Sequence, residues 1–152
     1  MSTSQKLDEL GIVLPPVATP LAAYTPAAKV GNQVWTSGQL PLVDGKLELT
    51  GKVGDGVTPE MAKAQARIAA LNALAAAAQV AGGVDAITRI CKITVFVSSA
   101  PDFTGQPGVA NGASELFGEV FGEPGVHVRS AVGVASLPIN ACVEVELVCE
   151  TA

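Results

Sequence analysis

The stretch from residue 57 to residue 83, VTPEMAKAQARIAALNALAAAAQVAGG, constrains the fold of this chain more than any other. It is rich in alanine and has the signals that begin and end a helix. Thr58 is a good N-cap, Pro59 suits the first helical position, and Glu60 complements the helix dipole. The glycine pair at 82–83 is typical of a helix end. The sequence therefore predicts a long helix whose small side chains allow it to pack close to a sheet.

One side of this helix is expected to face the core, because apolar residues recur on it at spacings of three and four. Lys63 and Arg67 mark the side that faces water. The expected core face consists of Met61, Ala64, Ile68, Leu71 and Ala75.

Strands are expected on both sides of the helix. Two hairpin turns are predicted before it, at Gly31-Asn32 and at Asp44-Gly45. After it, AITRICKITVFVSS reads as a strand, PGVANGASELFGEVFG as a second helix, and ACVEVELVCE as a last strand in clean alternation. This order, roughly βββαβαββ, predicts an α+β fold in which a single sheet carries two helices on one face. The other face must then be solvated or covered by another chain.

The stretch HVRSAVGVASLP, residues 127–138, is expected to be a strand with two unlike faces. The valines Val128, Val132 and Val134 are expected to point into the core. A face of small residues beside an arginine permits close approach by another backbone; it comprises Arg129, Ala131, Gly133 and Ala135. Charged residues make up only 15% of the chain, against about 25% in an average soluble protein. Both features favour an oligomer.

The length of 152 residues predicts one domain over 1–152, with residues 1–23 as an N-terminal lead that contains a proline-rich loop. No apolar run reaches the roughly 18 residues of a membrane span, so no membrane partner is expected. The N-terminus lacks a secretory pattern, and the three cysteines are an odd number. We therefore expect reduced thiols and a cytoplasmic protein.

Composition also argues against several kinds of partner. The net charge is −5 and the pI is about 4.7, which disfavours nucleic acid, because nucleic-acid binding depends on Lys and Arg. The chain has one histidine and no CxxC pair, so a structural zinc site is not expected. Glycine-rich dinucleotide and P-loop motifs are absent. These observations predict neither a metal nor a nucleotide cofactor.

Arg129 has two interpretations from the residue alone. It can be a strand-end arginine that reaches water or pairs with a carboxylate, or it can bind an anion, because a guanidinium holds a carboxylate through two hydrogen bonds. Glu144 and Glu146 either form an exposed polar face or include a carboxylate that activates water. If the last two strands pair through a turn at 137–141, Arg129 and Glu144 lie at opposite ends of that hairpin. A joint site would then need geometry across a subunit boundary.

Other candidates carry equally open alternatives. Tyr24 can anchor its loop or stack on a ligand, and Asn111 can interrupt the second helix or reach a ligand. Ser37 lies beside Gly38 in TSGQLP, where glycine permits close backbone approach, but Ser37 has no nearby base. A serine–histidine triad around His127 is formally possible, although no nucleophile-elbow motif supports it.

Three stretches together resemble the reactive intermediate deaminase family, also called Rid or YjgF-like. They are VGNQVWTSGQLPL, ICKITVFVSSAPDF and VRSAVGVASLPINACVEVELV, in the family's order, and the match runs from about Tyr24 to the C-terminus. The third stretch is the most specific, with Arg-Ser, then Leu-Pro, then Val-Glu-Val-Glu at fixed spacing.

The resemblance implies a fold like that of small chorismate mutases: one sheet with two helices, assembled as a homotrimer whose sheets form a central barrel. Ligand clefts would lie between subunits. Active members of the family hydrolyse reactive enamine and imine intermediates, such as 2-aminoacrylate, to 2-keto acids and ammonia without a cofactor. The implied partner is therefore a small substrate that bears a carboxylate.

The resemblance also implies roles for individual residues. Arg129 would grip the substrate carboxylate and Glu144 would hold the attacking water, which makes these two the expected catalytic residues. The remaining expected substrate-binding residues are Tyr24, Ser37, Gly38, Asn111 and Ala131.

The sequence departs from the family pattern in two places beside the arginine. Ala131 stands where a cysteine is common, and His127 stands where a proline is common. These departures do not affect the arginine that is expected to bind a carboxylate, but they leave the identity of the substrate open.

Two other functions are possible for the same chain. One is the binding of 2-keto acids or other small carboxylates without turnover, and the other is ribonuclease activity or inhibition of translation. The acidic charge counts against the second.

Overall fold

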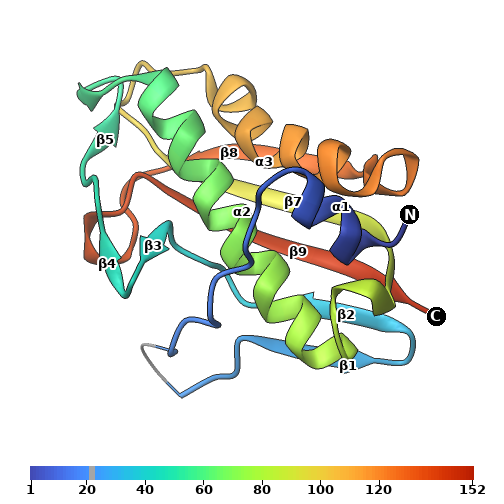
Figure 1. Ribbon diagram of the computed structural model, residues 1–152. Helices are drawn as coiled ribbons and strands as arrows, with labels where there is room; N and C mark the ends of the chain where they lie inside the picture. Colours follow the sequence, from blue (N-terminus) through green and yellow to red (C-terminus); the bar gives the residue numbers. More distant parts are fainter. Residues whose placement is uncertain (21–22) are drawn as a thin grey trace.

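The computed structural model describes residues 1–20 and 23–152 (Figure 1). Its main sheet has five strands in the order β1-β2-β9-β7-β8, and helices α2 and α3 lie side by side across one face of it. The predicted α+β fold with helices on one face of a sheet is confirmed. The elements of the main sheet and its helices are α1 (Thr3–Glu9), β1 (Ala27–Val30), β2 (Gln33–Thr36), α2 (Pro59–Ala81), β7 (Ile87–Ser98), α3 (Gln106–Phe121), β8 (Val128–Val134) and β9 (Val143–Thr151).

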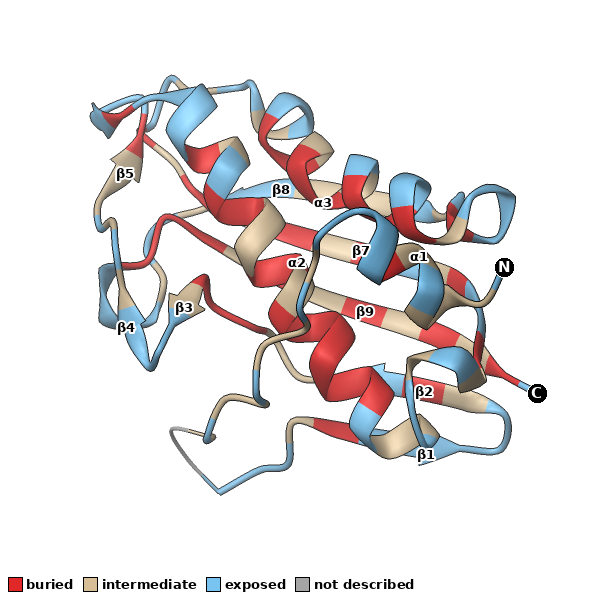
Figure 2. Ribbon diagram, in the orientation of Figure 1, coloured by how far each residue is buried: buried red, intermediate tan, exposed pale blue. Residues whose placement is uncertain are grey.

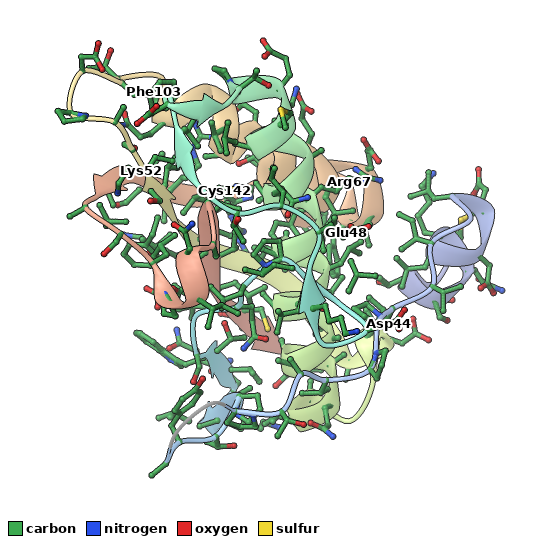
Figure 3. The ribbon with its side chains drawn as sticks, turned by 90° about the vertical axis from the view of Figure 1, so that its left-hand side faces the viewer. Asp44, Glu48, Lys52, Arg67, Phe103 and Cys142 are labelled. Atoms are coloured by element: carbon green, nitrogen blue, oxygen red, sulfur yellow. The ribbon has the colours of Figure 1, made fainter. Side chains whose placement is uncertain are left out.

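Short elements complete the chain between these. They are β3 (Leu42–Val43), β4 (Lys46–Leu47), β5 (Lys52–Val53), β6 (Gly56–Val57) and the 3₁₀ turns η1 (Val84–Ala86), η2 (Glu123–Gly125) and η3 (Pro138–Asn140). The Nζ of Lys52 donates to the carbonyl of Ala135, which ties β5 to the segment that follows β8 (Figure 3). Among the described residues, no helix has both the length and the apolar character needed to cross a membrane.

The ends of α2 are those the sequence predicts. The hydroxyl of Thr58 accepts a hydrogen bond of 3.2 Å from the amide of Met61, and Pro59 is the first helical residue. Gly82 ends the helix in the left-handed region, with φ +97°. Because glycine adopts this conformation without steric cost, the helix stops at the predicted place.

The predicted core face of α2 is wrong at its first two positions and correct at its last two. Met61 is 41% exposed and Ala64 is also exposed, whereas Leu71 packs against the core and Ala75 is buried. The buried face is built mainly from alanines. The helix turns its smallest side chains toward the sheet and α3, because these allow the closest approach (Figure 2). The buried residues of α2 are Ala62, Gln65, Ala66, Ala69, Ala70, Asn72, Ala73, Leu74, Ala75, Ala76, Ala77 and Ala78.

The two helices are in close contact at one glycine. A Cβ atom added to Gly112 of α3 would lie 2.0 Å from the carbonyl oxygen of Lys63 in α2. Ion pairs bridge the same helices at the surface, from Lys63 to Glu115 at 3.1 Å and from Arg67 to Glu119 at 3.3 Å. Lys63 and Arg67 therefore lie at the rim of this contact, and the position of α3 depends on the absence of a side chain at Gly112.

Both predicted hairpin turns are confirmed. Gly31 joins β1 to β2 with φ +63°, and Asp44 and Gly45 join β3 to β4 with φ +53° and +78°. Two successive positive φ angles are typical of the tight turn that an Asp-Gly pair favours.

The N-terminal lead contains a helix that was not predicted. In α1, Ser2 accepts a hydrogen bond from the amide of Gln5, and the Gln5 side chain accepts one from the amide of Ser2. Asp85 holds α1 against the body of the protein by accepting bonds of 2.7 Å from the amide and the hydroxyl of Ser4. The lead of residues 1–23 also includes 21 and 22, which lie outside the described residues.

Strand β8 differs from the prediction in both pairing and orientation. It pairs in parallel with β7, which separates it from β9, so the last two strands do not form a hairpin. Val128 and Val132 are 66% and 42% exposed, while Ala131 packs against the core. The valines therefore lie on the open face of the sheet. Small residues turn toward α3 because that helix approaches β8 closely; a Cβ on Gly133 would lie 2.9 Å from the Gln106 amide nitrogen.

Candidate functional site

Arg129, the second residue of β8, is held by two neutral side chains of α3. Its Nη1 donates to Oδ1 of Asn111 at 2.8 Å and to Oγ of Ser114 at 3.1 Å. Within the described part of the chain, no acidic side chain forms an ion pair with it. The positive charge is therefore fixed in place but not neutralised, as an anion-binding arginine requires.

His127 extends this group of hydrogen bonds. Its Nδ1 lies 2.6 Å from the carbonyl oxygen of Gly125, and its Nε2 lies 2.9 Å from Oγ of Ser114. Because a carbonyl oxygen can only accept, Nδ1 carries a proton. In the tautomer with that single proton, Nε2 accepts from the Ser114 hydroxyl. The ring also meets Phe117 edge to face, with 6.0 Å between centroids and an angle of 87°.

These side chains border a hollow of about 310 Å³ on the surface. It is open to solvent and has room for a small organic acid beside the guanidinium. Its lining residues are Ser114, Gly118, Gly125, Val126, His127 and Arg129. We use the name arginine cluster for Arg129, Asn111, Ser114 and His127.

Glu144 belongs to a second group on the open face of the sheet. Strand β9 alternates between buried residues that face the helices and half-buried ones, and Glu144 and Glu146 are among the latter. Burial raises the pKa of the Glu144 carboxyl, and the negative charge of Glu146 raises it further. A carboxyl with a raised pKa is a better acceptor of a proton from water.

Gly38 makes room for this carboxyl. A Cβ atom at Gly38 would lie 1.7 Å from Oε1 of Glu144, so the carboxyl occupies space that any other residue would fill. The backbone of Gln39 exchanges hydrogen bonds of 2.8 and 2.9 Å with that of Val145, which holds Gly38 beside β9. We use the name glutamate cluster for Glu144, Gly38, Ser37 and Tyr24.

Ser37 and Tyr24 lie beside Gly38. The Ser37 hydroxyl donates to the carbonyl of Thr25 at 2.6 Å, so it fixes the loop before β1. Tyr24 is 48% exposed and borders, with Gly38, a small hollow of about 30 Å³. The structure thus brings together four of the predicted residues, which are Tyr24, Ser37, Gly38 and Glu144.

The two clusters do not meet within one chain. The register of the sheet shows their separation. Arg129 in β8 is paired with Ile93 of β7, whereas Glu144 in β9 is paired with Phe96, three residues further along β7. Three residue steps and two strand spacings separate Arg129 from Glu144, roughly 14 Å between Cα atoms. Arg129 is also directed toward α3, while Glu144 lies on the opposite face. Ala131, two residues beyond Arg129, packs its methyl group against the core.

Sequence reasoning missed Ser114 and left the role of His127 open. Ser114 follows Asn111 by three residues, so the two share one face of α3, and this spacing was a readable signal. The contact with His127 was not readable, because it depends on how η2 returns the chain to β8. Among the described residues, no group of three or more histidine, cysteine or acidic side chains can hold a metal ion, and Cys91, Cys142 and Cys149 are free thiols.

Comparison with known proteins adds three findings. Protein TCP17 of Trypanosoma cruzi is 44% identical over 145 residues, which cover 95% of this chain and 91% of that protein. The 2-iminobutanoate/2-iminopropanoate deaminase of Dermatophagoides farinae is 30% identical over 89% of this chain and 91% of the relative. A crystal structure from Shewanella oneidensis, described as a "putative endoribonuclease", superposes with a TM-score of 0.94 at 34% identity and covers 99% of each chain.

A family model also matches this chain. The model described as "YjgF/chorismate_mutase-like, putative endoribonuclease" matches residues 4–151, nearly the whole chain. The predicted resemblance to the Rid or YjgF-like family is confirmed by this match and by the relatives. We conclude that the chain belongs to the YjgF/chorismate mutase-like family.

Proposed function

We propose that this protein hydrolyses reactive enamine and imine intermediates of the 2-aminoacrylate type to 2-keto acids and ammonia. The observation that carries the proposal is Arg129, a positioned guanidinium with no acidic partner among the described residues, at the edge of a hollow of about 310 Å³. A small 2-imino acid has the carboxylate that such a group binds. A relative named as an imine deaminase supports the same reaction class.

In the proposed reaction, Arg129 binds the substrate carboxylate and draws electron density from the neighbouring imine carbon. Glu144 orients a water molecule and takes its proton as the oxygen attacks that carbon. The proton then passes to the imine nitrogen, which gives an amino alcohol at that carbon. The hydroxyl proton follows to the nitrogen as the C=O bond forms and the C–N bond breaks, so ammonia leaves a 2-keto acid. An enamine reacts through its imine tautomer. An imine carbon is already electrophilic, so positioning and one oriented water are sufficient, and the reaction needs no cofactor.

We further propose that a second copy of the chain completes the site. Arg129 and Glu144 are too far apart in one chain to act on one small substrate, as the sheet register indicates. The open face of the sheet exposes large apolar side chains, including Trp35 at 52% and Val128 at 66%. A homotrimer whose sheets form a barrel would cover this face. Light scattering tests this arrangement, and a stable monomer would contradict it.

The decisive assay follows ammonia and keto-acid release from freshly generated 2-aminoacrylate. Wild type is compared with Arg129→Ala and with Arg89→Ala, which removes an exposed arginine from β7 as a matched control. We expect acceleration over buffer by wild type and Arg89→Ala, and loss of it in Arg129→Ala. Equal rates in buffer and enzyme, or full activity in Arg129→Ala, would refute the proposal.

Binding without turnover is the second candidate, and the separation of Arg129 from Glu144 within one chain is the observation that favours it. Calorimetry with pyruvate or 2-ketobutyrate distinguishes it from catalysis: binding with no acceleration of imine hydrolysis would identify a binding protein. Ribonuclease activity has weaker support, because the net charge is −5. Retention of RNA on a filter would be the result that favours it.

A further inference from the structure

We propose that Ser114 and His127 are positioning residues that hold Arg129 in one orientation for the substrate carboxylate. This inference rests on the proposed function for its kinetic test, but the hydrogen bonds that carry it are independent of any substrate. His127 stands where the family commonly has proline, so the inference also gives that departure a role.

The first step is the occupation of one side of the guanidinium. Nη1 donates to both Asn111 and Ser114, so both protons of this nitrogen are used. Nε and Nη2 have no acceptor among the described residues. These two nitrogens form the other edge of the planar group, and that edge can bind a carboxylate through two parallel hydrogen bonds.

The second step concerns the hydroxyl of Ser114. A serine inside a helix can rotate and donate to the carbonyl four residues earlier, and its oxygen would then turn away from the arginine. Here Nε2 of His127 lies 2.9 Å from the hydroxyl oxygen, and in the tautomer that carries its proton on Nδ1 the hydroxyl donates to this nitrogen instead. This bond fixes the proton of Ser114, so that a lone pair of its oxygen is directed toward Nη1 of Arg129.

The third step is the support of the histidine ring. Nδ1 donates to the Gly125 carbonyl, and Phe117 packs edge to face against the ring. Gly125 can bring its carbonyl here only because it lacks a side chain, since a Cβ would lie 2.1 Å from the carbonyl oxygen of Phe117. The series therefore runs from the backbone of η2 through His127 and Ser114 to Arg129.

A carboxylate held by Arg129 is bound in the ground state and in the transition state alike. Loss of a positioning residue should therefore raise KM and leave kcat nearly unchanged. The loss of one ordinary hydrogen bond corresponds to about a fivefold to tenfold weaker affinity. His127 acts only through Ser114 in this proposal, so its removal should add nothing once Ser114 is gone.

The experiment measures KM and kcat for imine hydrolysis, and Kd for pyruvate, in five variants. Ser114→Ala and His127→Phe should each weaken binding about fivefold to tenfold, and the phenyl ring keeps the contact with Phe117. His127→Gln should recover part of the loss, because its amide oxygen can accept from Ser114. The double variant, Ser114→Ala with His127→Phe, should match Ser114→Ala alone. Ser136→Ala, at an exposed serine, is the control.

Several results would overturn the inference. These are unchanged KM and Kd in Ser114→Ala, losses that add in the double variant, or a fall in kcat alone. Labelling of Ser114 by a fluorophosphonate would show that the Ser114–His127 pair acts as nucleophile and base, and would equally refute the positioning role.

A substrate-independent measurement separates this inference from the proposed function. The chain has a single histidine, so nitrogen–proton NMR of its ring reports on His127 without ambiguity. We expect the neutral ring to carry its proton on Nδ1. A proton on Nε2 would overturn the inference even if the enzyme is active, whereas an inactive enzyme that binds pyruvate would refute only the proposed function.

Discussion

The arginine cluster and the glutamate cluster are built in opposite ways. Arg129 is held by side-chain hydrogen bonds from α3, within the chain and on the helix side of the sheet. Glu144 lies on the open face against a glycine, and its environment depends on burial and on Glu146. The comparison teaches that the group proposed to bind the carboxylate is held entirely within one chain. The group proposed to activate water lies instead on the open face of the sheet, beside a glycine that leaves space for it.

The largest expected effect comes from breaking the glutamate cluster at Gly38. In Gly38→Ala, the new methyl group would overlap Oε1 of Glu144, so the carboxyl must move. A displacement of about 1 Å at a catalytic group can lower the rate about 100-fold. Imine hydrolysis should fall by this order, with little change in the urea midpoint. Unaltered activity would show that the position of the Glu144 carboxyl is not critical.

The second prediction disturbs the arginine cluster indirectly, by overpacking the contact between α2 and α3. In Gly112→Ala, the added methyl would lie 2.0 Å from the Lys63 carbonyl, so α3 must shift. Overpacking of this kind costs about 1–3 kcal/mol. Gly118→Ala in the same helix is the matched control, since its Cβ meets no atom within 4 Å, and alanine there should stabilise the helix by up to about 1 kcal/mol. Urea unfolding measures both, and equal stabilities would contradict the close contact.

A substitution outside both clusters should change stability without changing binding or activity. Oε1 of Gln65 in α2 is buried and has no hydrogen-bond partner among the described residues. Gln65→Met should therefore raise the free energy of unfolding by about 1 kcal/mol, since an unsatisfied buried polar atom is removed at similar volume. Thermal or urea unfolding checks this. Neither pyruvate binding nor imine hydrolysis should change, and a lower stability would mean that the amide has a partner.

The smallest expected effect is a shift in pH dependence. The pKa of Glu144 is raised, first by burial and then by Glu146. The rate should therefore fall with decreasing pH through a pKa above that of an ordinary glutamate. In Glu146→Gln the like charge is gone, so this limb of the pH–rate profile should move to lower pH. An unshifted limb would show that another group controls it.

The same raised pKa predicts the sign of a stability change. A carboxyl whose pKa is higher in the folded state contributes most below its unfolded pKa, and this contribution is lost as pH rises through the folded value. Glu144→Gln should therefore gain stability relative to wild type near neutral pH, and the difference should shrink on acidification. Urea titrations at a series of pH values measure it.

Local features of the fold could be predicted well. The Thr58 cap, the Gly82 end and the Asp44-Gly45 turn each depend on residues within a few positions of one another, and all are confirmed. The capping box of Ser2 and Gln5 had the same local signal and was overlooked. Family membership also followed from the sequence, because motif order and spacing are properties of the chain.

Which face of α2 and which face of β8 is buried could not be predicted in the same way. Alanine is nearly neutral between a core and a surface, so periodicity did not decide which side of α2 is buried. In β8, the valines were expected inside, but Ala131 packs against the core and α3 approaches Gly133 closely, while Val128 and Val132 face outward.

The sequence by itself determined where the helices and turns begin and end, which family the chain belongs to, and that an arginine stands in a strand of small residues. Only the tertiary structure decided which way that strand faces and how Ser114, His127 and Asn111 surround Arg129. The physical reason is the separation along the sequence between the groups that interact. Helix caps and turns form hydrogen bonds with neighbouring backbone groups. The arginine's partners reach it only after α3 and η2 have packed against the sheet.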